Sequence, residues 1–390
     1  MKTLVLTPDP DNIICHECGL SCSIPPLADS HKAQCPRCGF VLSAKHTNAL
    51  DRILAFSFTA LIFLAASLPF EFLSFKSNGL ERTIDVAASF NILIDNQYHT
   101  LALMELVTIF VIPLIILLGL IYLLFPLKQG RCPPHGKRVL DMVFWLIPWS
   151  MAEIFLIGAL VSLIKIISLA DIVLGPSFFA YILFSVALTT VMLHLDKHQL
   201  YKLLNKANKE PVEDKHHSSS HGNDRSISIQ KTWALIITSI VLYIPANMLP
   251  IMNTRLLGQD DPSTILGGVI LLWHMGSYPI AAVIFIASVA VPVAKILVLI
   301  WLNYSVQRRQ TNLTQERIVL YRIAEFVGRW SMVDVYVVII LVSLIQLGNT
   351  MSIYPGGASL AFCGVVIVTM LAAMTFDSHL IFNTDKNHEH

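Results

Sequence analysis

Charged side chains are scarce in this chain. Aspartate, glutamate, lysine and arginine make up 14% of its 390 residues, whereas hydrophobic residues make up 55%. A soluble domain usually carries about 25% charged residues, and the mean hydropathy here is +0.65. The shortage of charge excludes an ordinary soluble globular protein and predicts a chain that lies in a lipid bilayer.

Other absences narrow the function. The formal net charge is only +1, which leaves no basic face for nucleic acid. The sequence has no nucleotide-binding loop, so we do not expect ATP to drive this chain. It also has no motif for a cofactor pocket, and we expect a protein that is not an enzyme. Because the N-terminus is polar and carries cysteines, no cleavable signal peptide is expected before the first span.

Eight apolar stretches reach the roughly 20 residues that cross about 30 Å of hydrocarbon as an α-helix. They lie at about 53–73, 103–125, 142–164, 173–194, 233–252, 279–302, 323–347 and 358–376. Four stretches fall in each half of the chain. The predicted fold is therefore an all-α polytopic membrane protein.

The two halves repeat each other at a constant offset along the sequence. The segment Trp149–Glu153 recurs as Trp330–Asp334, and the letters LVSLI at 160–164 recur unchanged at 341–345. An even number of spans in each copy keeps both copies in one orientation. We therefore expect two parallel four-helix transmembrane repeats, related by an axis along the membrane normal.

Lysine and arginine set the expected orientation. Of the 27 basic residues, 21 lie in the N-terminal segment, the loops 126–140 and 303–322, the central segment 195–232 and the tail. Only Lys76, Arg82 and Arg255 lie in loops of the opposite side. The positive-inside rule then places both termini in the cytoplasm, in an inner or plasma membrane.

Four cysteines form two CxxC pairs, Cys15 with Cys18 and Cys35 with Cys38, joined by a short intervening segment. Two such pairs present four thiolates at the corners of a tetrahedron, which is the ligand set of a closed structural Zn²⁺ site. Gly19 and Gly39 follow the pairs as turn residues. The alternative is a thiol redox centre with Cys22 as a resolving thiol, but matched pairs in a reducing cytoplasm favour metal.

These features divide the chain into five parts. They are a zinc-ribbon domain at 1–47, a first transmembrane repeat at 48–198, a disordered cytoplasmic linker without a second ribbon at 199–231, a second repeat at 232–382, and a tail at 383–390. The linker holds a histidine cluster, His216-His217 and His221. A solvated segment is favoured over a metal site there, because no thiolates lie nearby.

Glu153 and Asp334 are the first candidates for function. Each lies about 11 residues into its predicted span, and an acid at that depth must face the bundle interior with a partner or carry a proton. One interpretation is a proton- or substrate-responsive pair. The other is that each acid, helped by Ser150 and Ser331, bonds a neighbouring helix and holds the bundle together.

The remaining intramembrane candidates are basic or aromatic. Lys295 follows Pro292 in the sixth span, and when the prolines are aligned the first copy has Ile116 opposite it. Lys165 ends the third span and is expected to snorkel to the far interface. Trp149 and Trp330 open the repeated motif. Two shorter segments, 83–100 and 264–278, are expected to be interfacial or re-entrant on the periplasmic side.

Long motifs carry a family resemblance. They are the paired CxxC ribbon, YIPANMLPIM at 243–252, PSTILGGVILLW at 262–273, GSYP at 276–279, EFVGRWSM at 325–332 and MTFD at 374–377. Together they resemble the paraquat-inducible protein A family, which includes relatives named lipophilic envelope-spanning tunnel protein A. Members commonly carry a second cysteine ribbon before the second repeat, whereas residues 195–232 here contain no cysteine.

The resemblance implies a Gram-negative inner-membrane protein that works with a periplasmic MCE-domain partner of the paraquat-inducible protein B type. Together they would move phospholipids between the membranes and support envelope integrity under stress. On this basis Glu153 and Asp334 are expected to line the lipid path or sense protons, and Lys295 to contact a head-group phosphate. The alternatives are a proton-coupled exporter of small molecules and a structural membrane anchor for the partner.

Overall fold

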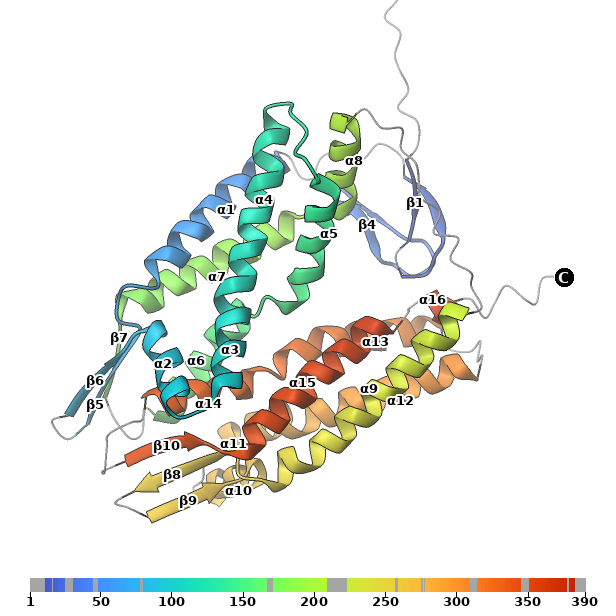
Figure 1. Ribbon diagram of the computed structural model, residues 1–390. Coiled ribbons are helices and arrows are strands. Elements are labelled where there is room, and N and C mark those ends of the chain that lie inside the picture. Colours follow the sequence, from blue (N-terminus) through green and yellow to red (C-terminus); the bar gives the residue numbers. More distant parts are fainter. Residues whose placement is uncertain are drawn as a thin grey trace, which may run out of the picture.

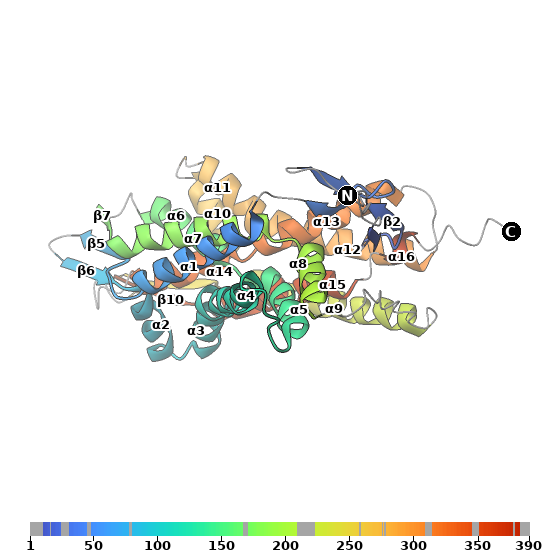
Figure 2. The same cartoon turned by 90° about the horizontal axis from the view of Figure 1, so that it is seen from above.

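The structure is a computed structural model. It describes residues 11–15, 17–24, 31–44, 48–77, 80–166, 171–208, 223–256, 259–274, 276, 278–308, 314–344, 351–376 and 379–382. Figure 1 shows two groups of helices, with α1, α4, α5 and α7 in one group and α9, α12, α13 and α15 in the other. Three-stranded sheets lie at one end of the long molecule and the cysteine-bearing strands at the opposite end (Figure 2).

The elements of the first half are β1 (Asp11–Ile14), β2 (Ser21–Ile24), β3 (Lys32–Gln34), β4 (Val41–Ala44), α1 (Ala49–Ala66), β5 (Leu73–Ser77), β6 (Leu80–Ile84), α2 (Val86–Asp95), α3 (His99–Leu106), η1 (Val107–Val111), α4 (Ile112–Lys128), α5 (Gly136–Leu146), η2 (Ile147–Trp149), α6 (Ala152–Ile166), β7 (Asp171–Leu174), α7 (Pro176–His194) and α8 (Lys197–Asn208). The elements of the second half are α9 (Asn223–Met248), β8 (Met252–Leu256), β9 (Gln259–Ser263), α10 (Ile265–His274), α11 (Tyr278–Phe285), η3 (Ile286–Ala290), α12 (Val291–Gln307), α13 (Thr314–Trp330), α14 (Val333–Leu344), β10 (Met351–Pro355), α15 (Gly357–Thr375) and α16 (His379–Phe382).

Within the described residues, eight helical stretches are long and apolar enough to cross a membrane. They are Ala49–Ala66, His99–Lys128, Gly136–Leu163, Pro176–His194, Ile227–Met248, Ile286–Gln307, Gln315–Leu344 and Gly357–Thr375. A predominantly helical protein with eight such helices agrees with the expected polytopic membrane class. The chain is therefore a multi-pass membrane protein.

Elements follow one another in the same order in both halves from α1 and α9 onward. The elements from β5 to α4 have counterparts in the elements from β8 to α12. In this stretch Leu73 of the first half is equivalent in sequence position to Met252 of the second. Helices α6 and α7 recur as α14 and α15, at the slightly longer offset that carries Ala152 to Val333. The separation that aligns Pro113 with Pro292 therefore applies to the whole stretch from the first hairpin, β5 and β6, through the second span.

The second span of each half widens at the same place. A π-helical turn, η1 or η3, directly precedes Pro113 in α4 or Pro292 in α12. Proline removes a backbone donor and its ring crowds the preceding turn, which favours such a local change of helix pitch. Thr108 of η1 and Ser288 of η3 are buried, so the inner side of each turn can offer backbone groups to neighbouring helices.

The third span of each half is interrupted, contrary to the continuous helices expected at 142–164 and 323–347. In the first half, α5 runs into the short turn η2 around Pro148, and α6 starts at Ala152. In the second half, Ser331 and Met332 form a turn between α13 and α14. Apolar length alone predicted one helix, because each apolar stretch continues through its break, although α5 and α13 are more polar than α6 and α14.

Two three-stranded antiparallel sheets correct the all-α prediction. The strand orders are β6-β5-β7 and β10-β8-β9. Leu73 of β5 pairs with Leu174 of β7, and Met252 of β8 pairs with Pro355 of β10. The strands were missed because each has only four or five residues and adjoins a long apolar run. They tie the ends of the first and last spans of each half together.

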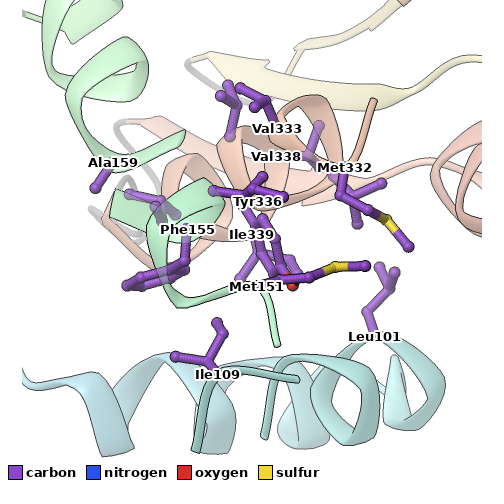
Figure 3. Close-up of a cluster of buried hydrophobic side chains, with 14 of the residues drawn as sticks. Leu101, Ile109, Met151, Phe155, Ala159, Met332, Val333, Tyr336, Val338 and Ile339 are labelled. Atoms are coloured by element: carbon purple, nitrogen blue, oxygen red, sulfur yellow. Dashed lines mark hydrogen bonds between the residues drawn. The ribbon is translucent and has the colours of Figure 1, made fainter. Parts of the chain in front are cut away.

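Helix α14 forms the centre of the molecule. All of its residues, Val333–Leu344, are buried, and it packs against α6, α2, β6, β10, α15 and η3. A helix that is apolar on every side is expected to lie in a protein core. Figure 3 shows Tyr336 of α14 among Met151, Phe155 and Ile109, which come from the other half. The main core thus lies where the halves meet.

The predicted linker at 199–231 is helical at both ends, where α8 and the start of α9 lie. Leu200 and Leu204 of α8 are buried against the α4 and α5 cluster. This amphipathic packing was hidden by the polar composition. The histidine cluster and the tail at 383–390 lie outside the described residues. The two segments expected to be interfacial hold the short helices α2 and α10.

Candidate functional site

The four cysteines come together at the N-terminal strands. Cys15, Cys18, Cys35 and Cys38 are buried, and their sulfur atoms all lie within 4.8 Å of one another. The Sγ atoms of Cys15 and Cys38 are 3.5 Å apart, as are those of Cys18 and Cys35. Tetrahedral Zn²⁺ with Zn–S bonds of about 2.3 Å separates its sulfurs by about 3.8 Å. The donor set therefore fits a four-thiolate metal site.

Glycines close the turns of both pairs, as expected. Gly19 has φ of 68° and Gly39 has φ of 70°, a region that favours glycine. Their N–H groups donate to the carbonyls of Cys15 and Cys35 at 2.9 and 2.8 Å. Cys22 lies outside this cluster, and its thiol is 3.7 Å from the carbonyl of Leu20.

The thiols differ in their affinity for protons. Burial raises the pKa of Cys38 to about 11 and also raises the pKa of Cys18. Burial acts in the same direction on Cys35, but hydrogen bonds to the backbone at Cys38 and Arg37 outweigh it and lower the pKa to about 7. Without metal, Cys35 is therefore a stronger acid than Cys18 or Cys38, and a metal must displace protons from those two.

The cysteine domain contacts the second half through α13. Arg322 donates from Nε to both carboxylate oxygens of Glu17, at 3.1 and 3.0 Å, and from Nη2 to Glu17 and to the carbonyl of Cys38. Arg37 donates to the carbonyl of Phe382 in α16 at 3.2 Å. A bidentate arginine contact fixes direction as well as distance.

The same domain also contacts the first half. Oδ2 of Asp196 accepts hydrogen bonds from Ser43 Oγ at 2.8 Å and from the N–H of Ala44 at 2.9 Å. Gln199 of α8 donates to the carbonyl of Ala44 at 2.7 Å. The cysteine domain therefore joins the two halves at the end opposite the sheets.

The two repeated acids occupy equivalent positions in different surroundings. Glu153 lies in the first turn of α6, and Asp334 lies in the first turn of α14. The Glu153 side chain is exposed and accepts a hydrogen bond from Thr189 of α7 at 2.5 Å. Asp334 is only 9% exposed. The breaks thus put each acid at a helix N-terminus, which favours negative charge.

The break in the first half meets the π turn of the second span. The N–H of Met151 donates to the carbonyl of Thr108 at 3.3 Å. The hydroxyl of Thr108 is 2.7 Å from the hydroxyl of Tyr336, which is also 3.5 Å from Met151 Sδ. Backbone groups freed by an interrupted membrane helix need such partners. Thr108 therefore links a break in one half to the central helix of the other.

Other polar atoms at the breaks are buried and have no hydrogen-bond partner among the described residues. They are Trp149 Nε1, Ser150 Oγ and Ser331 Oγ. Buried polar atoms of this kind are usually satisfied by water or a ligand. Trp330, the counterpart of Trp149, is 43% exposed and packs against Phe326 at a ring separation of 6.0 Å.

Lys295 is buried, with 4% of its surface exposed. Its amine lies over Gly328 of α13, where an added Cβ would come within 2.3 Å of Nζ. Glu325, one turn earlier on α13, attracts it electrostatically. Lys165 lies near the end of α6, and its side chain falls outside the described part of the structure.

The sequence interpretation missed Glu105 of α3. This carboxyl is 2% exposed and accepts a hydrogen bond from Ser89 of α2 at 2.8 Å. It is the only acid in the apolar stretch 103–125, a signal that was available. It was overlooked because it lies near the start of that stretch and has no counterpart in the other half.

Comparisons with known proteins agree with this architecture. The sequence model described as paraquat-inducible protein A matches residues 50–205 and again 229–385. The chain is 35% identical to the intermembrane transport protein PqiA of Escherichia coli strain K12, with 97% of each chain covered.

More distant relatives also match over nearly their whole length. Identity is 27% to the lipophilic envelope-spanning tunnel protein A of Escherichia coli, covering 96% of this chain and 91% of the relative. It is 25% to a probable intermembrane transport protein of Haemophilus influenzae, with 98% of each covered. No solved structure matches the chain.

Proposed function

Since this chain belongs to the paraquat-inducible protein A family, we propose that it is the inner-membrane component of a system that moves phospholipids between the membranes of a Gram-negative envelope. It would load or receive lipid for a periplasmic partner with MCE domains. This role would support envelope integrity under stress. The printed names of the relatives, which describe intermembrane transport and an envelope-spanning tunnel, support the proposal.

The observation that carries the proposal is the pair of interrupted helices at the centre of the membrane bundle. Transporters commonly place their substrate site where discontinuous helices of two repeats meet. Here α6 and α14 pack against each other, and buried polar atoms at their breaks lack protein partners among the described residues. A path for a polar lipid head group through an apolar bundle requires polar atoms of this kind, which are free to bind the head group.

In this proposal the halves are parallel repeats, with both termini and the cysteine domain in the cytoplasm. The excess of lysine and arginine on that side supports this orientation. The cysteine domain is a structural zinc ribbon, which folds a segment too short to be stabilised by burial alone. Elemental analysis of the purified chain should then find about one zinc per molecule.

Glu153, Asp334 and Lys295 have separate roles in this scheme. Glu153 is exposed beside α7 and lines the lipid path. Asp334 lies at the start of the central helix, where a change of charge would disturb the contact between the halves. The buried amine of Lys295 is the group suited to a phosphate, to which it would bind as a point charge.

The test is phospholipid transfer and partner binding by three variants, Glu153→Gln, Asp334→Asn and Lys295→Met, each compared at equal abundance in the membrane. We expect reduced transfer with the MCE-domain partner still bound. Normal transfer in all three would contradict the assigned roles. Purified protein that carries neither phospholipid nor an MCE-domain partner would favour a proton-coupled exporter. Binding of the partner without any effect on lipid would favour a structural anchor.

A further inference from the structure

Glu105 lies in a closed environment between the first and second halves. It is the penultimate residue of α3, just before the π turn η1, and its neighbours Met104 and Thr108 both contact the second half. Met104 Sδ is 2.9 Å from Sγ of Cys363 in α15, and the hydroxyl of Thr108 is 2.7 Å from that of Tyr336. Only 2% of the surface of Glu105 is exposed, so its carboxyl is enclosed by protein.

One oxygen of the carboxyl is bonded and the other is not. Oε1 accepts from Ser89 Oγ at 2.8 Å. Oε2 is buried and has no hydrogen-bond partner among the described residues. An ionised carboxylate normally accepts several hydrogen bonds, so a single neutral donor leaves most of its negative charge uncompensated.

Among the described side chains, the helices packed around Glu105 offer no lysine or arginine to compensate this charge. Helix α2, the turn η1 and helix α14 contain no lysine or arginine, and α3 offers only His99, six residues before Glu105. Helix α6 carries a lysine only near its far end, at Lys165. The titratable groups that interact with Glu105 from packed elements are weak acids, Tyr336 on α14 and Tyr181 on α7.

An isolated charge at membrane depth costs about 2.5–3.5 kcal/mol by insertion scales. The neutral acid avoids this cost. Its carbonyl oxygen, Oε1, can accept the hydrogen bond from Ser89, and the proton then resides on Oε2. The geometry of Glu105 is therefore that of a carboxylic acid and not of a carboxylate.

We propose that Glu105 is a proton-binding site that holds its proton while α2, α3 and α15 are packed together and releases it when they loosen. Release leaves a carboxylate at Oε1 and Oε2 that must be hydrated, which requires water to enter between α2 and α3. The aligned position in the second half is Ile284, so the site belongs to the first half alone. This inference goes beyond the proposed function and holds whichever molecule is transported.

Infrared spectroscopy of the full-length protein in lipid nanodiscs tests the proton. We expect the absorption of a protonated carboxyl in the parent protein at neutral pH to be lost in Glu105→Gln, which preserves shape and the bond to Ser89. Glu153→Gln is the control, and its exposed acid should leave that band unchanged. Ser89→Ala should shift the band to higher frequency, because the C=O group loses its donor. A band that is absent in the parent, or unchanged in both Glu105→Gln and Ser89→Ala, overturns the proposal.

Cys363 reports the loosening, because its thiol contacts the residue before Glu105. Maleimide labelling at Cys363, followed by mass spectrometry of its peptide, should rise more steeply with pH in the parent than in Glu105→Gln. The comparison between the two proteins removes the ordinary effect of pH on thiol reactivity. Equal pH profiles would show that the proton does not control this packing and would overturn that part of the proposal. Neither measurement depends on lipid transfer, so a failure here is distinct from a failure of the proposed function.

Discussion

Lys295 is buried because α13 has no side chain at the place where its amine lies. Gly328 faces the end of the lysine, and Glu325 provides opposite charge one turn away. A lysine within a membrane span would otherwise snorkel toward the interface. The space left by Gly328 therefore holds the Lys295 amine against α13.

Gly328→Ala is expected to displace Lys295 without removing its charge, because the new Cβ would lie 2.3 Å from Nζ and 2.8 Å from Cε. If the position of the amine matters for lipid transfer, the loss should resemble that of Lys295→Met. The control is Gly268→Ala in α10, where an added Cβ meets nothing within 4 Å. Full transfer activity in Gly328→Ala, with lysine displaced, would argue against a role for Lys295 in binding phosphate.

Tyr336→Phe removes the hydroxyl that joins Thr108 of the first half to α14. Polar contacts between membrane helices contribute on average about 0.6 kcal/mol, so we expect a loss of stability of about that size. Unfolding in a denaturing detergent measures it, with Tyr243→Phe as the control, because the Tyr243 hydroxyl donates to the Val289 carbonyl within the second half and links no residues of different halves. Equal stabilities of Tyr336→Phe and the parent would show that the link contributes nothing.

At the scale of elements, the cysteine domain connects the helices of the first half to those of the second, which were predicted from the sequence as two separate repeats. It contacts Asp196 just before α8, Gln199 of α8, and Arg322 of α13. Cys18 and Cys38 flank the contact with α13, since Glu17 precedes Cys18 and the carbonyl of Cys38 accepts from Arg322. The cysteine turns and the surface that contacts α13 are therefore one structure.

Arg322→Ala should release the domain from α13 while leaving the four cysteines able to bind metal. We expect the zinc content to be unchanged and the protease sensitivity of the segment up to Ala44 to increase. Chelation of zinc, in contrast, should remove the zinc and also increase this sensitivity. Arg131→Ala, on an exposed loop, is the matched control. A domain that resists protease equally in Arg322→Ala and in the parent would mean that other contacts suffice to hold it.

The sequence predicted the four-cysteine cluster and the eight helices because each has a local signal, either ligand spacing or apolar length. It did not predict the breaks at Ser150 and Ser331, since each apolar stretch runs through its break without an interruption in length. The different surroundings of Glu153 and Asp334 were also hidden, because burial depends on which neighbours pack against each helix. The burial of Glu105 follows from α2 and α14, of which α14 is distant in sequence.

At the scale of the whole molecule, the halves meet in two regions that are far apart. One is the surroundings of α14, which include its crossing with α6, where Gly158 allows Tyr336 to approach: an added Cβ would lie 2.9 Å from the Tyr336 Cβ. The other is the cysteine domain, at the end opposite the sheets (Figure 2). Contacts that share no residues should contribute independently to the association of the halves.

This separation predicts the behaviour of a divided protein. When residues 1–208 and 223–390 are expressed as two polypeptides in one membrane, we expect them to co-purify. Gly158→Leu should weaken the association by forcing α6 away from α14, and zinc chelation should weaken it further. Gly268→Leu, placed in open space on α10, should leave it unchanged. Halves that stay together in Gly158→Leu after chelation would show that neither the α6–α14 crossing nor the cysteine domain is the dominant contact, and would point to the contacts of α14 with α2 and η1.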